Sequence, residues 1–252
     1  AYTNNDICDF VNGSWSPANP MSNIWTSSYK AIQICNQYLA EFQGLTFDEL
    51  KLNDDYRAQM FRYTNSFKEA RFLRAYFYFN LVRAYGDVPY FTEMVTTDQV
   101  NSLTRTPAQE IFNAIIAECD KLSTELPADY TKLGLDGIAP AENGRVTCYA
   151  ALALKARAAL YAASPLFNPE NNKDLWRRAA EANKEVIETC TANGFKLSKY
   201  SELWGPNNWS NNEMIFVRRY NGNISTLEEY NFPMGVPGGN SGNCPTQNTV
   251  SY

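Results

Sequence analysis

The 252-residue sequence contains no histidine, and this absence excludes several classes of active site at once. Ser-His-Asp and Cys-His nucleophile pairs both need an imidazole as general base. Zinc sites that use a histidine ligand are excluded for the same reason. An enzyme built on this chain would therefore depend on carboxylates, lysine, tyrosine or a cofactor.

Long apolar runs are also absent. No segment approaches the ~20 consecutive apolar residues of a membrane-spanning helix. Residues 1–15 are polar and lack the basic and apolar regions of a signal peptide. We expect the chain to be a processed or trimmed part of a longer protein, in which targeting information precedes it.

Excess positive charge is missing as well. The chain has 22 basic and 27 acidic residues, a formal net charge of -5, and its Lys and Arg residues are scattered. Nucleic-acid binding depends on clustered basic residues that contact phosphates, so we expect no nucleic-acid partner. A neutral partner or substrate fits this balance better.

The six cysteines form no CxxC pair, which argues against a metal site. Cys35, Cys119, Cys148 and Cys190 lie in segments with helical apolar patterns, where a free thiol behaves as a small hydrophobe. We favour buried thiols over a disulfide framework and expect no metal or other cofactor. A calcium site at the adjacent carboxylates of residues 54–55 stays an open alternative, although their spacing is not that of an EF-hand.

Helical patterns dominate residues 1–194. A first amphipathic helix is predicted between Pro20 and Gly44. A second begins with Thr106 as N-cap and Gln109 as its capping-box partner. An Ala-rich helix that ends before Pro165 and a helix from Asp174 to the Asn-Gly pair at 193–194 predict a helical hairpin.

The most unusual segment is the aromatic-rich stretch at residues 67–85, which predicts a helix that is apolar nearly all round. Only Arg71, Arg74 and Tyr78 form a narrow polar stripe. Because an exposed aromatic face would promote aggregation, we interpret this helix as core. Gly86 is its predicted C-cap. The two arginines could form an anion site, but pairing with Glu69 or with carboxylates of neighbouring helices is favoured.

After Gly194 the sequence becomes rich in Gly, Pro and Asn, with one β-favouring segment around residues 215–217. Leu-Arg-Ala at 73–75 and Leu-Lys-Ala at 154–156 form a weak internal repeat, as is typical of stacked helical pairs. The predicted fold is mainly α: a tetratricopeptide-like scaffold at residues 1–194, with an N-terminal loop, and a loop-rich segment at 195–252 containing a few short strands.

Residues 69–93, EARFLRAYFYFNLVRAYGDVPYFTE, closely resemble the hallmark segment of the SusD/RagB family, the surface glycan-binding lipoproteins of Bacteroidetes. Residues 25–39, 144–163 and 245–252 resemble further family segments in the same order. The resemblance implies a tetratricopeptide-like, non-enzymatic receptor that delivers glycans to a SusC-type TonB-dependent transporter. It also implies an extracellular, lipid-anchored position on the outer membrane in the full-length precursor, and a C-terminal part that begins where this chain stops.

Candidate glycan-binding residues lie in two loops. Sugar rings stack their C–H faces on aromatic rings, and their hydroxyls bond to amides and charged groups. Trp15 lies between Asn12 and Asn19, and Trp209 follows Asn208. We predict that these five residues contact the glycan.

Two other functions stay open at this point. A helical-repeat adaptor would bind a peptide in its concave groove. A glycoside hydrolase would need two carboxylates facing each other across a cleft, and no loop-borne pair of Asp or Glu residues stands out.

Overall fold

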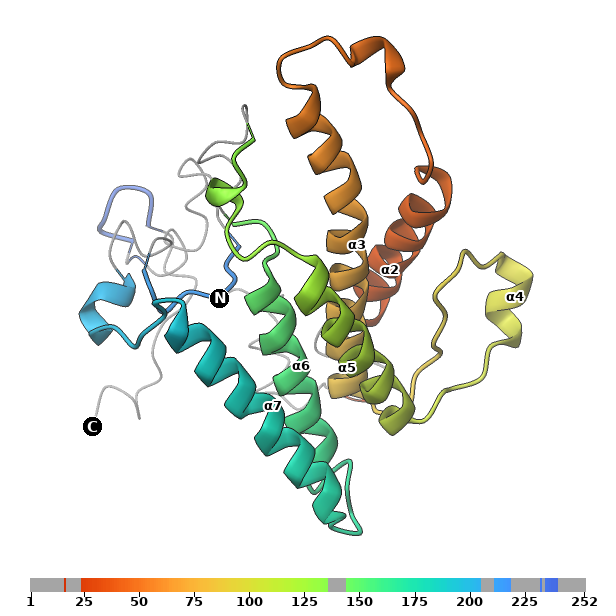
Figure 1. Ribbon diagram of the computed structural model, residues 1–252. Helices are drawn as coiled ribbons and strands as arrows, with labels where there is room; N and C mark the ends of the chain where they lie inside the picture. The colour runs from red at the N-terminus through yellow and green to blue at the C-terminus, as the bar shows by residue number, and fades with distance from the viewer. Residues whose placement is uncertain are drawn as a thin grey trace. The chain divides into compact units, whose positions relative to one another are not determined.

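The computed structural model describes residues 16, 24–135, 144–204, 211–218, 232 and 234–239 (Figure 1). The chain divides into two units, Ile24–Val217 and a second that combines Ala1–Asn23 with Arg218–Tyr252. All helices of the described residues belong to Ile24–Val217. The predicted domain boundary at residue 194 stays a prediction.

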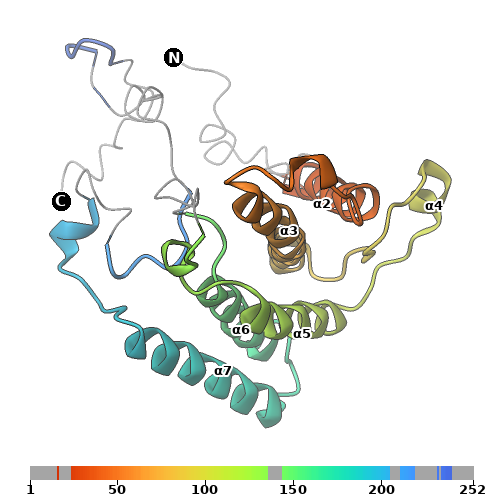
Figure 2. The ribbon, with the colours of Figure 1, turned by 45° about the horizontal axis from the view of Figure 1, so that its top comes forward.

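Helices account for most of the unit Ile24–Val217. Successive long helices pack against one another: α2 on α3, α3 on α5, α5 on α6 and α6 on α7. They run antiparallel (Figure 1), and in a second view they follow one another in an arc (Figure 2). The predicted mainly α, helical-pair scaffold is confirmed. The elements are α2 (Ile24–Glu41), η1 (Asp48–Leu50), α3 (Tyr56–Tyr85), α4 (Thr97–Ser102), α5 (Ala108–Glu125), η2 (Tyr130–Lys132), α6 (Cys148–Ala163), α7 (Lys173–Ala192) and η4 (Tyr200–Trp204).

The ends of the long helices follow local rules. At the end of α3, Gly86 adopts φ +69°, which favours glycine, and its N–H donates to Val82 O at 2.9 Å. Before α7, the Asn172 side chain accepts a hydrogen bond from the backbone N–H of Asp174. Gly194, with φ +87°, follows the end of α7, as predicted.

The capping box predicted for α5 is wrong. The N-cap position is Pro107, which offers no side-chain acceptor. Instead Asp87 Oδ1 accepts from the backbone N–H of Ala108 at 2.8 Å, from a position 21 residues earlier. The Gln109 amide donates to the carbonyls of Ala162 and Phe167, so it joins α5 to the end of α6.

The core combines aromatic and small residues. On α3, Phe72, Tyr78 and Phe79 are almost fully buried and Phe77 packs partly buried against the core, so the aromatic helix is core as predicted. Trp25 and Trp176 both lie inside segments with a helical pattern, where the sequence predicts core tryptophans; Trp25 packs partly buried against the core, but Trp176 is 39% exposed. The prediction for Trp176 is wrong because, among the described helices, α7 packs extensively against α6 alone.

The cysteine prediction is confirmed for the four in described helices. Cys35, Cys119 and Cys190 are buried, Cys148 is half-buried, and all four thiols are free. Burial raises the pKa of each thiol, so they remain protonated near neutral pH. Cys8 and Cys244 lie outside the described residues.

The strand predicted around Ile215 is not formed. Residues 211–218 contain turns and bends, and Met214 N–H bonds locally to Asn211 O. Phe216 lies with its ring edge-on to Phe72, 5.6 Å away. A β-favouring sequence becomes a strand only when another strand pairs with it, and none does so within the described residues. No helix among those residues is long and apolar enough to cross a membrane.

Candidate functional site

The five glycan-contact residues predicted from the sequence, Trp15, Asn12, Asn19, Trp209 and Asn208, all lie outside the described residues. Their role therefore stays a prediction. Within the described part of the chain, no group of three or more Cys, Asp or Glu side chains is placed to hold a metal ion. At residues 54–55, the Asp55 carboxylate accepts from the Gln59 amide one turn later. Two polar clusters on α3 remain as candidate sites.

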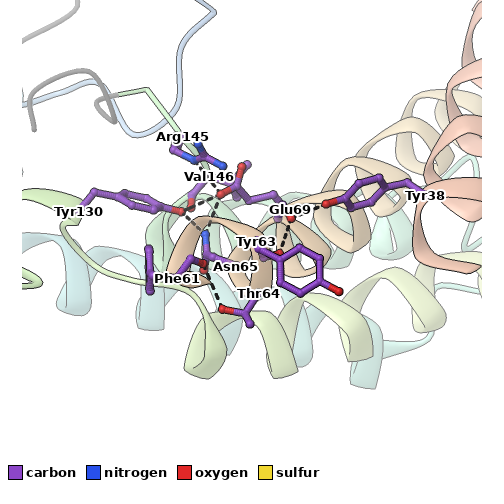
Figure 3. A network of polar contacts seen from close by, with 10 residues as sticks. Tyr38, Phe61, Tyr63, Thr64, Asn65, Glu69, Tyr130, Arg145 and Val146 are labelled. Carbon is purple, nitrogen blue, oxygen red and sulfur yellow. Dashed lines mark hydrogen bonds and ion pairs between the residues drawn. The ribbon is translucent and has the colours of Figure 1, made fainter. Parts of the chain in front are cut away.

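The first cluster joins α3 to η2 and to the segment before α6 (Figure 3). The Tyr130 hydroxyl accepts from Asn65 Nδ2 at 2.8 Å and donates to Val146 O at 2.7 Å. Glu69 Oε1 accepts from Asn65 Nδ2 at 2.7 Å and from Arg145 Nε at 2.9 Å. Burial, together with the charge of Glu69, raises the pKa of Tyr130, so its hydroxyl stays a donor. Because these groups bond to one another, we assign the cluster a structural role.

The second cluster lines a pocket of about 260 Å³ between α3, α5 and the extended segment that follows Gly86. Residues three, four and seven apart lie on one face of a helix, so α3 contributes one stripe of residues and α5 another. The lining residues are Arg71, Arg74, Ala75 and Tyr78 from α3, Tyr90 and Thr92 from the extended segment, and Ala114, Ile115 and Glu118 from α5.

Arg71 joins the two helices at this pocket. Its Nε donates to Glu118 Oε1 and its Nη1 to Glu125 Oε2, both at 2.6 Å. Burial alone would lower the pKa of Arg71, but the hydrogen bonds and charges of Glu118 and Glu125 outweigh it and raise that pKa. The predicted pairing with carboxylates of a neighbouring helix is confirmed for this arginine, whereas Glu69 pairs with Arg145 instead.

Arg74 differs from Arg71 because both of its hydrogen-bond partners are neutral. Its Nη1 donates to Asn36 Oδ1 at 2.9 Å and to the backbone oxygen of Thr92 at 2.8 Å. Asn36 is 2% exposed and donates in turn to Glu93 O, so the guanidinium is held in a fixed place. The prediction that Arg74 pairs with a carboxylate is wrong: within the described residues none is bonded to it.

Two tyrosines complete the pocket. The buried Tyr78 hydroxyl donates to Phe91 O at 2.7 Å and accepts from Phe91 N–H at 2.9 Å, which fixes the extended segment on α3. The Tyr90 ring lies 4.6 Å from the Tyr78 ring, centroid to centroid. Burial raises the pKa of Tyr90 although the charge of Arg74 opposes it. The Tyr90 hydroxyl makes no hydrogen bond to any described residue, so it is available to a ligand.

Sequence reasoning identified the two arginines but missed Tyr90, Thr92 and Glu118. One signal was present, because a chain that leaves a helix at Gly86 and turns at Pro89 can run back over that helix. In the structure Tyr90 and Thr92 of this segment line the pocket beside Arg74, whereas the Phe91 ring stacks on Tyr29 of α2. An aromatic ring, a guanidinium and a carboxylate around a small cavity are groups that recognise the C–H face and hydroxyls of a sugar.

Comparison with known proteins gives this scaffold a family. The model of a SusD-like family, described as starch-binding and associating with the outer membrane, matches residues 2–160. SusD-like protein P2 of Formosa agariphila is 26% identical over 210 residues, which cover 82% of this chain and 35% of the relative. The chain spans about a third of the length of the curated relatives that it matches.

Solved structures of SusD-like proteins share the helical scaffold of this chain. A SusD-like carbohydrate-binding protein of Bacteroides fragilis aligns with a TM-score of 0.57 and 28% identity, covering 77% of this chain and 32% of the other. A laminarin-binding SusD-like protein aligns with a TM-score of 0.59 and 25% identity, covering 84% of this chain and 40% of the other. From its match to the family model and its helical scaffold, this chain belongs to the SusD-like family of outer-membrane-associated, starch-binding proteins.

Proposed function

We propose that the protein binds a polysaccharide or oligosaccharide at the outer face of the outer membrane and delivers it to a SusC-type TonB-dependent transporter. The observation that carries this proposal is the family match over residues 2–160, joined to similarity with carbohydrate-binding and laminarin-binding proteins. In the full-length precursor a lipid anchor would hold the protein at the membrane. Copurification of a SusC-type transporter with the full-length protein would test the partner.

The proposed role is binding without catalysis. Glycoside hydrolysis requires two carboxyl groups about 5 to 10 Å apart across a cleft. In the pocket on α3 and α5, the lining carboxylate is Glu118, and it is bonded to Arg71. We therefore expect the purified protein to release no reducing ends from any polysaccharide that it binds. Turnover that disappears when one Asp or Glu is replaced would contradict this role.

A panel of polysaccharides, screened by calorimetry and affinity electrophoresis, tests glycan binding directly. If Trp15 and Trp209 stack on sugar rings, Trp15→Ala or Trp209→Ala should weaken binding by about 1 to 3 kcal/mol, the range of aromatic hot spots and stacked bases. Thermal stability should hardly change, since an exposed ring contributes little to a core.

Trp176→Ala is a matched control, because Trp176 is a partly exposed tryptophan on α7, which does not line the pocket. Its glycan affinity should equal that of the wild type. Loss of stability with unaltered affinity in the Trp15 and Trp209 variants would show that these rings are structural. Failure of every polysaccharide to bind would overturn the proposed function itself.

A further inference from the structure

We propose that the pocket between α3 and α5 binds the carboxylate of an acidic sugar residue, a uronic acid, within the glycan that the protein receives. This inference rests on the proposed function, because it specifies one class of residue in the bound glycan. Three features carry it: the charge of Arg74, which pairs with no carboxylate of the described residues, the hydroxyl of Tyr90, which bonds to none of those residues, and the size and apolar floor of the cavity.

Arg74 offers a hydrogen-bonding edge that matches a carboxylate. A guanidinium has five N–H donors. The two on Nη1 are used by Asn36 Oδ1 and Thr92 O, which leaves Nε–H and the Nη2 donors. Parallel hydrogen bonds from two neighbouring nitrogens to the two oxygens of a carboxylate are the strongest arrangement available to arginine. Because Asn36 is buried and fixes Nη1, this edge is preorganised, and little side-chain entropy remains to be lost on binding.

The charges around the pocket favour an anion at Arg74 rather than at Arg71. Arg71 is already neutralised by Glu118 and Glu125 on α5. Of the two guanidinium groups that line the pocket, Arg74 is the one bonded to no carboxylate of the described residues, so an incoming anion would pair with Arg74. A partly buried charge attracts an opposite charge more strongly than an exposed one, since less water screens it.

The rest of the pocket suits a single sugar ring. Its volume of about 260 Å³ is smaller than the ~300–1,000 Å³ that drug-sized ligands occupy, so it fits one residue rather than a length of chain. Ala75, Ala114 and Ile115 provide an apolar floor, and the Tyr90 ring provides an aromatic face for the C–H groups. The Tyr90 hydroxyl is then a donor or acceptor for the ligand.

The net charge of -5 limits which acidic glycan fits. A glycan with a carboxylate on every residue would be repelled by the net negative charge of these 252 residues. A glycan with occasional uronic acids among neutral residues avoids most of that repulsion and still places one carboxylate at Arg74. The inferred ligand is therefore a mixed glycan, not a polyanion.

The test compares glucuronate, glucose, acetate and neutral oligosaccharides by calorimetry at low ionic strength, with the wild-type protein and three variants. Arg74→Gln should weaken glucuronate binding at least about tenfold, since a hydrogen bond to a charged group is lost. Tyr90→Phe removes the hydroxyl alone and should weaken it about three- to tenfold. Tyr76→Phe is the matched control on the same helix, because Tyr76 does not line the pocket, and it should change nothing.

Each possible result of these titrations either supports or overturns the uronic-acid site. Glucuronate that binds the wild type more tightly than both glucose and acetate, and loses affinity in both pocket variants, supports the inference. Equal binding of acetate would show a carboxylate site with no preference for a sugar, which overturns it. Neutral oligosaccharides that bind while glucuronate does not would overturn the inference and leave the proposed function standing. Glucuronate binding that both pocket variants retain would place the site elsewhere, and this also overturns it.

Discussion

Helices α3 and α6 each pack against neighbouring helices on two sides, yet they are built from opposite kinds of residue. The buried positions of α3 include Phe72, Tyr78 and Phe79. Ten residues of α6 are buried, and seven of them are alanines. Aromatic rings on α3 fill the space between helices, whereas alanines on α6 leave little space to fill.

This difference shows that a helix can be buried in two ways. Interaxial distances of packed helices vary with the side chains at the contact, so an alanine face lets neighbours approach closely. On α6 that face receives both α5 and α7. The two helices meet where Phe79 of α3 contacts Tyr161 of α6 edge-on, 5.2 Å between ring centroids. We expect α3 to be sensitive to loss of volume and α6 to be sensitive to gain of volume.

Phe79→Ala should cause the largest loss of stability. Phe79 is 1% exposed, and truncating a buried Phe costs about 3 to 5 kcal/mol, through lost burial and the cavity left behind. Urea unfolding followed by circular dichroism measures the change. Tyr76→Ala, at a position 37% exposed on the same helix, should cost much less. Equal losses in the two variants would mean that α3 is not held by its buried rings.

Ala158→Leu tests the opposite sensitivity on α6. Ala158 is fully buried, and extra methylene groups in a packed core cost about 1 to 3 kcal/mol. Ala153→Leu, at a half-buried position of the same helix, is the control and should cost less. The same unfolding experiment compares them. If Ala158→Leu were neutral or stabilising, α6 would have a cavity beside it, and the contrast with α3 would disappear.

The same contrast explains how much of the fold the sequence could predict. The aromatic segment and the Ala-rich segment both show helical periodicity, and Gly86 marks the end of α3, so both helices were predictable from local patterns. The first eleven residues of α3, at positions 56–66, were missed because their apolar residues are interrupted by polar ones. The cap of α5 was missed because Asp87 supplies it from 21 residues away.

The candidate site was predictable only in part, for a similar reason. Arg71 and Arg74 are the polar stripe of an apolar helix, and that stripe is visible in the sequence. Which arginine is neutralised depends on Glu118, which is 47 residues from Arg71 in the chain. A single sequence holds no information on such a contact, so both arginines were expected to pair, and only one does.

The polar side chains that join α3 and α6 to their neighbours differ in how far their partners are buried. Two substitutions should show this difference. Tyr130→Phe removes a hydroxyl that bonds to Asn65 of α3 and to Val146 O, and should cost about 1 to 2 kcal/mol because buried partners are left unsatisfied. Lys155 of α6, whose own side chain is 15% exposed, pairs with Asp120 and Glu185, whose side chains are 63% and 44% exposed; the two carboxylates stay solvated when the lysine is lost, and methionine keeps its apolar stem buried. Lys155→Met should therefore change stability by less than about 1 kcal/mol. A larger loss for Lys155→Met than for Tyr130→Phe would reverse this ranking.

The last prediction concerns the pH dependence of stability through Cys119 on α5, the helix that packs against both α3 and α6. Burial raises the pKa of this thiol from its ordinary 9.0 to about 12. The unfolded chain releases the thiol proton above pH 9 while the folded protein keeps it, so stability is full below pH 9 and falls as the pH rises toward 12. At pH 10 the loss from this thiol should be about 1 to 2 kcal/mol.

Urea unfolding at pH 7 and pH 10 measures that loss, and Cys119→Ala isolates the thiol from the other groups that ionise. Burial also raises the pKa of Tyr29, Tyr78 and Tyr130, so stability should still fall at high pH in the variant, but by about 1 to 2 kcal/mol less than in the wild type. The stability of each protein at pH 10 is compared with its own stability at pH 7, so any effect of the alanine substitution on the fold cancels. Equal losses in the two proteins would show that Cys119 contacts water in the folded state, which means that α5 does not seal the space between the aromatic helix and the alanine helix.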